Sequence, residues 1–400
     1  MMDLAYKYRL FILFAIAFVA TQLVFIPILR IAKGKNIVDN PDARKLQKEP
    51  VPVMGGIAVF FGITVGLCFY KTMIVYTSLF PVLGAMTVML YLGSIDDILS
   101  LSPKLRFAIE VIVALVLLYG LKCCIVNFQG LWGIDCIPVW LGVLLSVVTF
   151  VGIVNSINMI DGVDGLCSAF CVLILGFFGI FCFLAGDYSF AVLSAVCIGS
   201  LIPFFLHNVF GWSTKMFIGD GGTMMIGTAV SAMVFVILRR NFGIEEAFPE
   251  LNFSRIAFVL AVMSIPVSDT IRVMLVRAFQ HKSPFSPDKN HLHHIFVAAG
   301  FSYISVTIIE LCLDIFVIAV FVLSWIAGAS VSGQVYVVLA ATVLADFGTA
   351  CLLKYLASRN SATYARIRGR AERTHVERKG FWLIIQKIID GRYDSLQERK

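Results

Sequence analysis

Long apolar stretches alternate with short polar segments along almost the whole chain. A bilayer core of roughly 30 Å is crossed by about 20 apolar residues in a helix, and about eleven stretches meet this requirement. The pattern therefore predicts an all-α polytopic integral membrane protein with about eleven transmembrane helices. The predicted spans begin near Arg9, Val51, Ser78, Leu105, Ile137, Gly165, Ser189, Thr223, Ser254, Tyr303 and Gly333.

The composition supports a location in the bilayer. Of the 400 residues, 59% are hydrophobic and 14% are charged, which is unlike a soluble domain. We divide the chain into a transmembrane domain, residues 1–357, and a basic cytoplasmic tail, residues 358–400. The tail carries eleven Lys or Arg against five Asp or Glu, which favours contact with an anionic membrane surface over nucleic acid.

Basic residues in short loops mark the cytoplasmic side of a membrane protein. They follow the first, third and ninth predicted spans, for example Lys104 and Arg106, whereas the second, fourth, sixth and tenth loops contain almost none. This distribution predicts an outside N-terminus and a cytoplasmic C-terminus, with Lys7 and Arg9 counting mildly against it.

Four polar motifs follow odd-numbered spans, which places all of them on the cytoplasmic side. They are Asp96-Asp97, residues 155–164, residues 219–222 and residues 291–294. Because hydropathy does not require this arrangement, we expect the four motifs to form one cytoplasmic cleft.

Each acidic motif contains oxygen ligands of the kind that bind Mg²⁺. The neighbouring carboxylates Asp96 and Asp97 repel each other unless a cation lies between them, although a charge pair at the membrane boundary is an alternative. In the sequence NSINMIDGVDGL, glycines alternate with polar residues and allow the chain to approach a ligand; a polar helix cap is the alternative. The polar residues of this segment are Asn155, Asn158, Asp161 and Asp164.

The third and fourth motifs contain groups that suit a phosphorylated nucleotide. Asp220 precedes two glycines and a predicted helix start, where backbone amides can meet a phosphate. Three residues earlier, Phe217 can stack on a base, although a core role is the simpler interpretation. The histidines of the sequence NHLHH favour phosphate binding over a zinc site, because Arg277 and Lys289 oppose capture of a cation.

Clustered aspartates repel an anionic substrate, whereas Lys48, Lys104, Arg277 and the histidines attract one. A site with both kinds of group suits a diphosphate bound to Mg²⁺, because the ion neutralises the carboxylates. The charge balance therefore predicts phosphoryl transfer, in which an ionised acceptor phosphate attacks directly.

The motifs SIDD, NSINMIDGVDGL, FIGDGG and SPFSPDKNHLHH, with VDNPDARK and PVPVMGG, resemble the polyprenyl-phosphate N-acetylhexosamine-1-phosphate transferases (glycosyltransferase family 4) over about residues 36–302. The sister branch, which makes lipid I from UDP-N-acetylmuramoyl-pentapeptide, has three successive histidines. The order His291-Leu292-His293-His294 therefore favours the N-acetylglucosamine branch.

The resemblance implies transfer of an N-acetylhexosamine 1-phosphate from a UDP-sugar to undecaprenyl phosphate, with release of UMP and a requirement for Mg²⁺, or Mn²⁺ in its place. It implies a bacterial inner-membrane protein whose product starts O-antigen, teichoic acid or capsule synthesis. The implied catalytic residues are Asp96, Asp97, Asp161 and Asp164, and the implied metal ligands are Asp97, Asn158 and Asp220. The implied substrate-binding residues are Lys48, Lys104, Asn155, Asn158, Gly162, Asn208, Phe217, Arg277, His291, His293 and His294.

Three alternatives remain open from the sequence. One is lipid I synthesis, and another is a membrane zinc enzyme built on the histidines. The third is an ion-coupled secondary transporter, because Asp269, Asp314 and Asp346 lie within apolar stretches. The sequence also leaves open which N-acetylhexosamine is used and whether the chain forms a homodimer.

Overall fold

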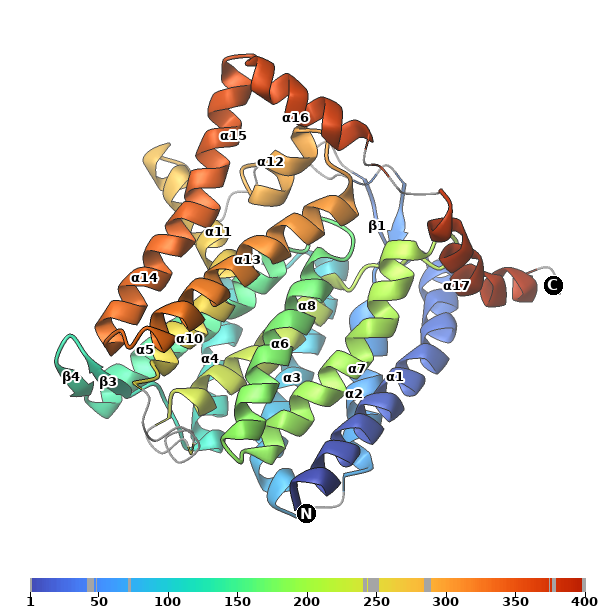
Figure 1. Ribbon diagram of the computed structural model, residues 1–400. Helices are drawn as coiled ribbons and strands as arrows, with labels where there is room; N and C mark the ends of the chain where they lie inside the picture. Colours follow the sequence, from blue (N-terminus) through green and yellow to red (C-terminus); the bar gives the residue numbers. More distant parts are fainter. Residues whose placement is uncertain are drawn as a thin grey trace.

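The computed structural model is a bundle of helices with two short pairs of antiparallel strands (Figure 1). It describes residues 2–41, 47, 49–70, 73–239, 243, 252–283, 289–373, 375 and 379–397. The helices of the first half are α1 (Met2–Gly34), α2 (Gly55–Cys68), α3 (Met73–Leu99), α4 (Pro103–Leu121), α5 (Val139–Met159), α6 (Leu166–Leu184), α7 (Tyr188–Phe210) and α8 (Gly219–Ile237).

The second half of the chain is also helical. Its elements are α10 (Arg255–Val262), α11 (Ser264–Phe279), α12 (Leu292–Ala298), α13 (Tyr303–Ile326), α14 (Val331–Val343), the π-helical turn η1 (Leu344–Gly348), α15 (Thr349–Ser358), α16 (Ala362–Arg373) and α17 (Phe381–Gln397). The strand pairs are β1 (Val38–Asp39) with β2 (Val51–Pro52), and β3 (Asn127–Leu131) with β4 (Ile134–Cys136).

Each predicted span corresponds to a helix, but the helices differ in their suitability for crossing a membrane. Among the described residues, eight helices are long and apolar enough, or nine if the bent pair α10 and α11 forms one span. Of the others, α2 has only 14 residues, and α4 carries Lys104, Arg106 and Glu110. The all-α prediction is confirmed, whereas the count of eleven spans stays a prediction.

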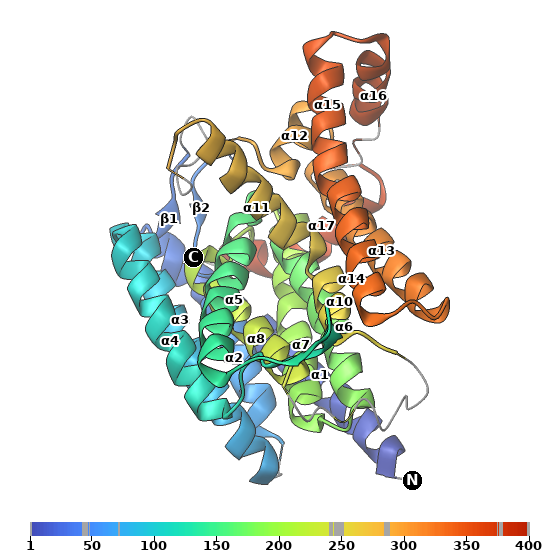
Figure 2. The ribbon, with the colours of Figure 1, turned by 90° about the vertical axis from the view of Figure 1, so that its left-hand side faces the viewer.

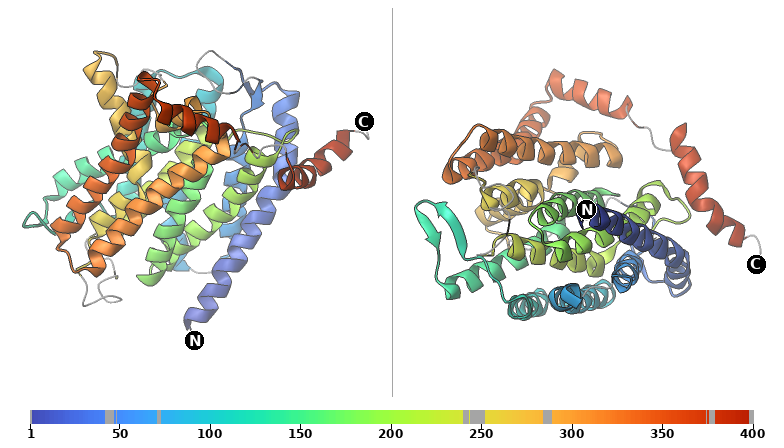
Figure 3. Two further views of the ribbon diagram at one scale, coloured as in Figure 1. Left: turned by 45° about the horizontal axis from the view of Figure 1, so that its top comes forward. Right: turned by 60° about the horizontal axis from the view of Figure 1, so that its bottom comes forward.

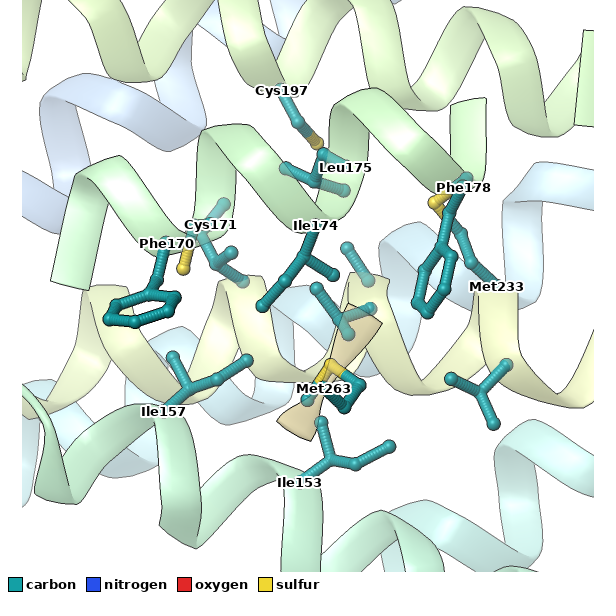
Figure 4. Packing of buried hydrophobic residues seen from close by; sticks show 14 of the residues in the cluster. Ile153, Ile157, Phe170, Cys171, Ile174, Leu175, Phe178, Cys197, Met233 and Met263 are labelled. Atoms are coloured by element: carbon teal, nitrogen blue, oxygen red, sulfur yellow. The ribbon is translucent and has the colours of Figure 1, made fainter. Parts of the chain in front are cut away.

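The central helix of the bundle is α8, which packs against α2, α3, α5, α6 and α7 (Figures 1 and 2). Glycines allow this close packing: a Cβ atom at Gly227 would lie 2.9 Å from the Cα of Val154 on α5. Figure 4 shows the apolar core beside it, where Phe178 of α6 lies near Met233 of α8 and Phe170 of α6 lies near Ile157 of α5. This packing holds α8, and with it the start of the helix, in a defined position relative to α3 and α5.

The pair α10 and α11 bends by 72° at Met263. Pro266 lacks an amide hydrogen for the helical ladder at this point. The buried carboxylate of Asp314 on α13 accepts hydrogen bonds from the Ser264 hydroxyl (2.7 Å) and the Ile265 amide (3.0 Å), which satisfy the start of α11. Sequence and a tertiary contact together account for the break.

The segments that carry the polar motifs gather at one end of the bundle (Figure 1). We call this the motif end; it comprises the C-terminal ends of α3, α5 and α7, the start of α8, and α12. The strand pair β3 and β4 lies at the opposite end. Figure 3 shows α16 and α17 on the outside of the bundle, and α17 packs against α7.

Candidate active site

All four motifs meet at the motif end. The Asp220 backbone amide, at the start of α8, donates to Asp97 Oδ1 on α3 (3.1 Å), and the Asn158 side chain on α5 donates to Asp220 Oδ1 (2.8 Å). In the loop after α5, a Cβ atom at Gly162 would lie 2.4 Å from Nε2 of His293. The structure thus brings together the segments that the sequence predicted to form one cleft.

The N-terminus of α8 is bound by a protein carboxylate. The helix begins at Gly219, whose φ of +75° favours glycine. Asp220 is therefore the second residue of α8 and does not lie in the loop before it. A Cβ atom at Gly222 would lie 2.8 Å from the Cα of Gly56, and one at Gly221 would lie 2.8 Å from a backbone oxygen of α3. These two glycines allow close helix packing, and the expectation that backbone amides at the start of α8 meet a phosphate stays a prediction.

The cation at the centre of the acidic cluster is Arg106 of α4. Its Nη1 donates to Asp96 Oδ2 (3.1 Å) and Asp220 Oδ2 (3.4 Å), and its Nη2 donates to Asn158 Oδ1 (2.9 Å). The sequence analysis used Arg106 only as a marker of orientation. The guanidinium thus links α4 to α3, α5 and α8.

Glu110 is a second residue that the sequence analysis missed. It is buried, with 1% of its surface exposed, and accepts hydrogen bonds from Arg106 Nε (3.2 Å) and Asn155 Nδ2 (2.7 Å). The predicted substrate residue Asn155 therefore binds a protein carboxylate here. The spacing i, i+4 of Arg106 and Glu110 within an apolar segment was the available signal.

The donor set of this cluster fits a divalent cation such as Mg²⁺. The guanidinium of Arg106 pairs with three carboxylates, those of Asp96, Glu110 and Asp220, and a fourth, that of Asp97, accepts from the Asp220 amide, so carboxylates outnumber the cation in this cluster. Carboxylates are hard oxygen ligands, and Asp220 is 37% exposed, so an ion can reach it from water. Asp97 and Asp220 are the charged candidate ligands, and Asn158 is a neutral one whose Oδ1 accepts from Arg106.

The loop between α5 and α6 carries two further predicted residues. Asp161 reaches solvent but is crowded by protein atoms, and this dehydration, together with the charges of Asp220 and Asp164, raises its pKa to about 8. Asp164 accepts from Lys215 Nζ (2.5 Å), which also lies 5.8 Å from the Phe217 ring centroid. Lys215, another residue that we did not predict, therefore lies between Asp164 and the ring of Phe217, which the sequence suggests can stack on a base.

The histidines lie on and just before α12. His291 Nδ1 contacts Asp269 Oδ2 (2.7 Å), and the Leu292 amide donates to Asp269 Oδ1 (2.9 Å). Burial lowers the pKa of His293 well below its usual range, with the neighbouring His294 and His291 adding to the effect, so its ring is neutral. Within the described chain its Nδ1 has no hydrogen-bond partner. A neutral imidazole can donate one N–H to a phosphate oxygen.

The histidine geometry does not favour the zinc alternative. The rings of His291 and His293 are parallel, with centroids 5.6 Å apart, and do not converge on one point. Nowhere in the described ranges, the acidic cluster included, do three His, Cys, Asp or Glu side chains form a group that could hold a metal ion by themselves. A Mg²⁺ ion at Asp97 and Asp220 would therefore need substrate phosphates and water as its other ligands, which is usual for Mg²⁺ but not for a structural zinc site. Phosphate binding therefore remains the better interpretation of these histidines.

Buried charges hold the histidine segment in place. Arg272 of α11 pairs with Asp269, and it also donates to Asp346 Oδ1 in η1 (2.9 Å) and to the Asn290 carbonyl (3.1 Å). We call Asp269, Arg272, Asp346 and His291 the histidine brace. The three acids that suggested a transporter thus have structural partners: Asp269 and Asp346 pair with Arg272, and Asp314 binds the start of α11.

The remaining predicted residues lie apart from this cluster or cannot be placed. Asn208 is buried, and its amide accepts from the Gly165 nitrogen (2.7 Å) and donates to the Met216 carbonyl (3.1 Å), so it connects two loops of the site. Lys104 is exposed at the start of α4, and Arg277 is buried in the last turn of α11. Lys48 lies outside the described residues.

Comparison with known proteins gives consistent matches. Residues 79–238, which include α4, α5 and α8, match the model of glycosyl transferase family 4. The chain is 31% identical over 307 residues to the probable undecaprenyl-phosphate N-acetylglucosaminyl 1-phosphate transferase of Bacillus subtilis (strain 168), covering 76% of this chain and 82% of the relative. It is 29% identical over 292 residues to the undecaprenyl-phosphate alpha-N-acetylglucosaminyl 1-phosphate transferase of Escherichia coli (strain K12). This match covers 71% of this chain and 76% of the relative.

Proposed function

Because the chain belongs to glycosyl transferase family 4, we propose that it transfers N-acetylglucosamine 1-phosphate from UDP-N-acetylglucosamine to undecaprenyl phosphate and releases UMP. Its product would be the lipid-linked sugar that starts synthesis of a cell-surface polysaccharide. The observation that carries this proposal is the convergence of Asp97, Asn158 and Asp220 at the motif end.

We propose that Asp97 and Asp220 hold Mg²⁺, with Mn²⁺ as a substitute. A bound divalent ion supplies positive charge that offsets both the carboxylates and the phosphates of the substrate. Arg106 keeps Asp220 and Asn158 in place and adds a fixed positive charge beside them. Asp96, which accepts from Arg106 and from the Leu101 amide (2.7 Å), orients this guanidinium.

The other side chains of the site would hold the donor. Phe217 offers a flat ring for the uracil base, and Asp164 with Lys215 offers an acceptor and a donor beside it. The Nδ1 atom of His293 is buried without a partner among the described residues, and it would donate to a phosphate oxygen only if donor binding opens access to it. The acceptor phosphate is largely ionised at neutral pH, so it can attack without a nucleophile from the protein.

The proposed orientation places the motif end in the cytoplasm, where a nucleotide sugar is available. The distribution of Lys and Arg supports an outside N-terminus and a cytoplasmic C-terminus. An odd number of spans, such as the roughly eleven expected from hydropathy, agrees with these sides, and the bacterial relatives support a location in the inner membrane. A labelling map of single cysteines on a cysteine-free background tests this topology. Cysteines at positions 97, 161, 220 and 294 must all react from the cytoplasmic side; position 294 is used because position 293 is buried.

The reaction is tested with purified protein, undecaprenyl phosphate and a panel of UDP-sugars that includes UDP-N-acetylmuramoyl-pentapeptide. We expect UMP release and a lipid product with the mass of undecaprenyl-diphosphate-N-acetylglucosamine, and both should require Mg²⁺. Asp135→Asn, in the exposed β4 strand at the opposite end of the bundle, is the matched control for Asp220→Asn and should keep full activity. Product formation only from the pentapeptide donor would instead establish lipid I synthesis.

A further inference from the structure

The C-terminal helix α17 binds the turn that leads from α7 into the site. Asp390 of α17 is buried, and its Oδ2 accepts from the Trp212 amide (2.9 Å). Its Oδ1 accepts from the Thr214 amide (3.1 Å) and the Thr214 hydroxyl (2.7 Å). One carboxylate thus satisfies three donors of a single turn, although α17 lies outside the residues that match the family model.

The hydrogen bonds continue from the turn to α7 and α1, and the donor of each can be assigned. Since the Thr214 hydroxyl donates its hydrogen to Asp390, it must accept from His207 Nδ1, 3.0 Å away. The Nε2 atom of a neutral His207 is then an acceptor for the side-chain amide of Gln22 on α1 (3.1 Å). The turn is therefore one link in a chain of hydrogen bonds from α1 to α17.

Further contacts dock α17 beside α1 and α7 (Figure 1). Lys33 of α1 donates to the Ser213 carbonyl (2.6 Å) and lies 4.6 Å from the Tyr393 ring centroid. The rings of Trp382 and Phe210 have centroids 4.5 Å apart. Asp390 thus acts from a helix that is itself fixed to the bundle.

A pocket of about 170 Å³ lies between α17 and the residues Asp164 and Lys215, which the proposed function places beside the uracil base. Its walls include the pair Asp164 and Lys215, and α17 contributes the side chains of Trp382 and Gln386. Lys215 follows Thr214 directly, and Phe217 follows two residues later. A shift of the turn would therefore move both groups that the proposed function assigns to the donor.

We propose that Asp390 is a positioning residue for donor binding, which it supports by holding the 212–214 turn and thus Lys215 and Phe217. This inference rests on the proposed function. Without the carboxylate, the donor would have to order the turn when it binds, so the KM for the UDP-sugar should rise. The residues of the acidic cluster bind one another across α3, α4, α5 and α8, so kcat should change little.

The test compares Asp390→Ala, Asp390→Asn and Asp394→Ala in the full-length protein. We expect Asp390→Ala to raise the KM for UDP-N-acetylglucosamine about tenfold, because misplaced binding groups cost at least this much. The kcat and the KM for undecaprenyl phosphate should stay within about twofold. Asp390→Asn keeps one acceptor oxygen, so its KM for UDP-N-acetylglucosamine should lie between those of the wild type and Asp390→Ala. Asp394 is exposed on the same helix, so its variant should match the wild type.

A wild-type donor KM in Asp390→Ala would overturn the inference. If that variant does not fold, Thr214→Val and Thr214→Ser serve in its place, because only serine keeps the hydroxyl that Asp390 binds. A higher donor KM in the valine variant alone supports the inference, and equal KM values in both overturn it. Absence of UMP release by the wild-type protein would instead refute the proposed function.

Discussion

Two ionic networks lie near each other at the motif end, and they differ in charge balance and in exposure. In the active-site cluster, Arg106 pairs with three carboxylates, a fourth, Asp97, binds the Asp220 amide, and Asp220 is 37% exposed. In the histidine brace, Arg272 joins Asp269 and Asp346, and all three side chains are at most 4% exposed. The first network is open and has excess negative charge, whereas the second is closed and paired.

This difference separates groups that bind a ligand from groups that hold the structure. Removal of a partner from a buried, paired network leaves a charge without compensation, and the free energy of unfolding falls. Removal of a carboxylate from the open cluster instead reduces repulsion in the absence of metal. We therefore expect substitutions in the active-site cluster to lower activity more than stability, and substitutions in the histidine brace to lower stability more than activity.

The largest effect on activity should come from Asp220→Asn or Asp97→Asn. Each substitution removes a charged ligand of the proposed Mg²⁺, and we expect kcat/KM to fall at least about a hundredfold. UMP release in saturating Mg²⁺ measures the loss. The thermal midpoint in detergent should not fall, and near-normal turnover by either variant would contradict the assigned roles.

The largest effect on stability should come from Asp269→Asn in the histidine brace. The change leaves the buried Arg272 with one carboxylate partner fewer, which costs about 3–5 kcal/mol when a buried pair is broken. Thermal unfolding without Mg²⁺ measures this loss, and Asp220→Asn is the matched comparison. A thermal midpoint equal to that of the wild type would show that the brace does not stabilise the fold.

A smaller effect on activity is expected for Arg106→Gln. Loss of the guanidinium frees Asp220 and Asn158 and increases the negative charge of the cluster, so kcat should fall about tenfold to a hundredfold. The same charge change should lower the Mg²⁺ concentration needed for half-maximal activity. An Mg²⁺ titration of activity tests both expectations, and a raised Mg²⁺ requirement would contradict this view of Arg106.

The smallest effect should be the pH dependence of stability due to Asp161. Its folded pKa of about 8 lies above its ordinary value of 3.8, so between these values the folded state binds more protons than the unfolded state. Stability without divalent metal should therefore fall as pH rises from 6 to 8. Asp161→Asn should flatten this slope in pH-dependent thermal scans. Because the side chain reaches solvent, we expect a modest change, and an unchanged slope would contradict the assigned pKa.

The sequence predicted the helical class and the segments that form the site, because both depend on local patterns. Apolar runs of membrane length identified most helices, and the parity of the motif positions predicted their convergence. It did not predict the partners within the site. Arg106, Glu110 and Lys215 were missed as site residues because their importance depends on neighbours from other helices, such as Asn158 and Asp164.

The sequence by itself determined that this protein is helical, belongs in a membrane and carries acidic motifs at the ends of its helices, since hydropathy and spacing act along one chain. Only the tertiary structure decided what each polar side chain does. It assigned the glycines of α8 to helix packing, and it paired the intramembrane acids with Arg272 or with the start of α11. The physical reason is that hydrogen bonds and charge compensation depend on distances across helices, which no local pattern fixes.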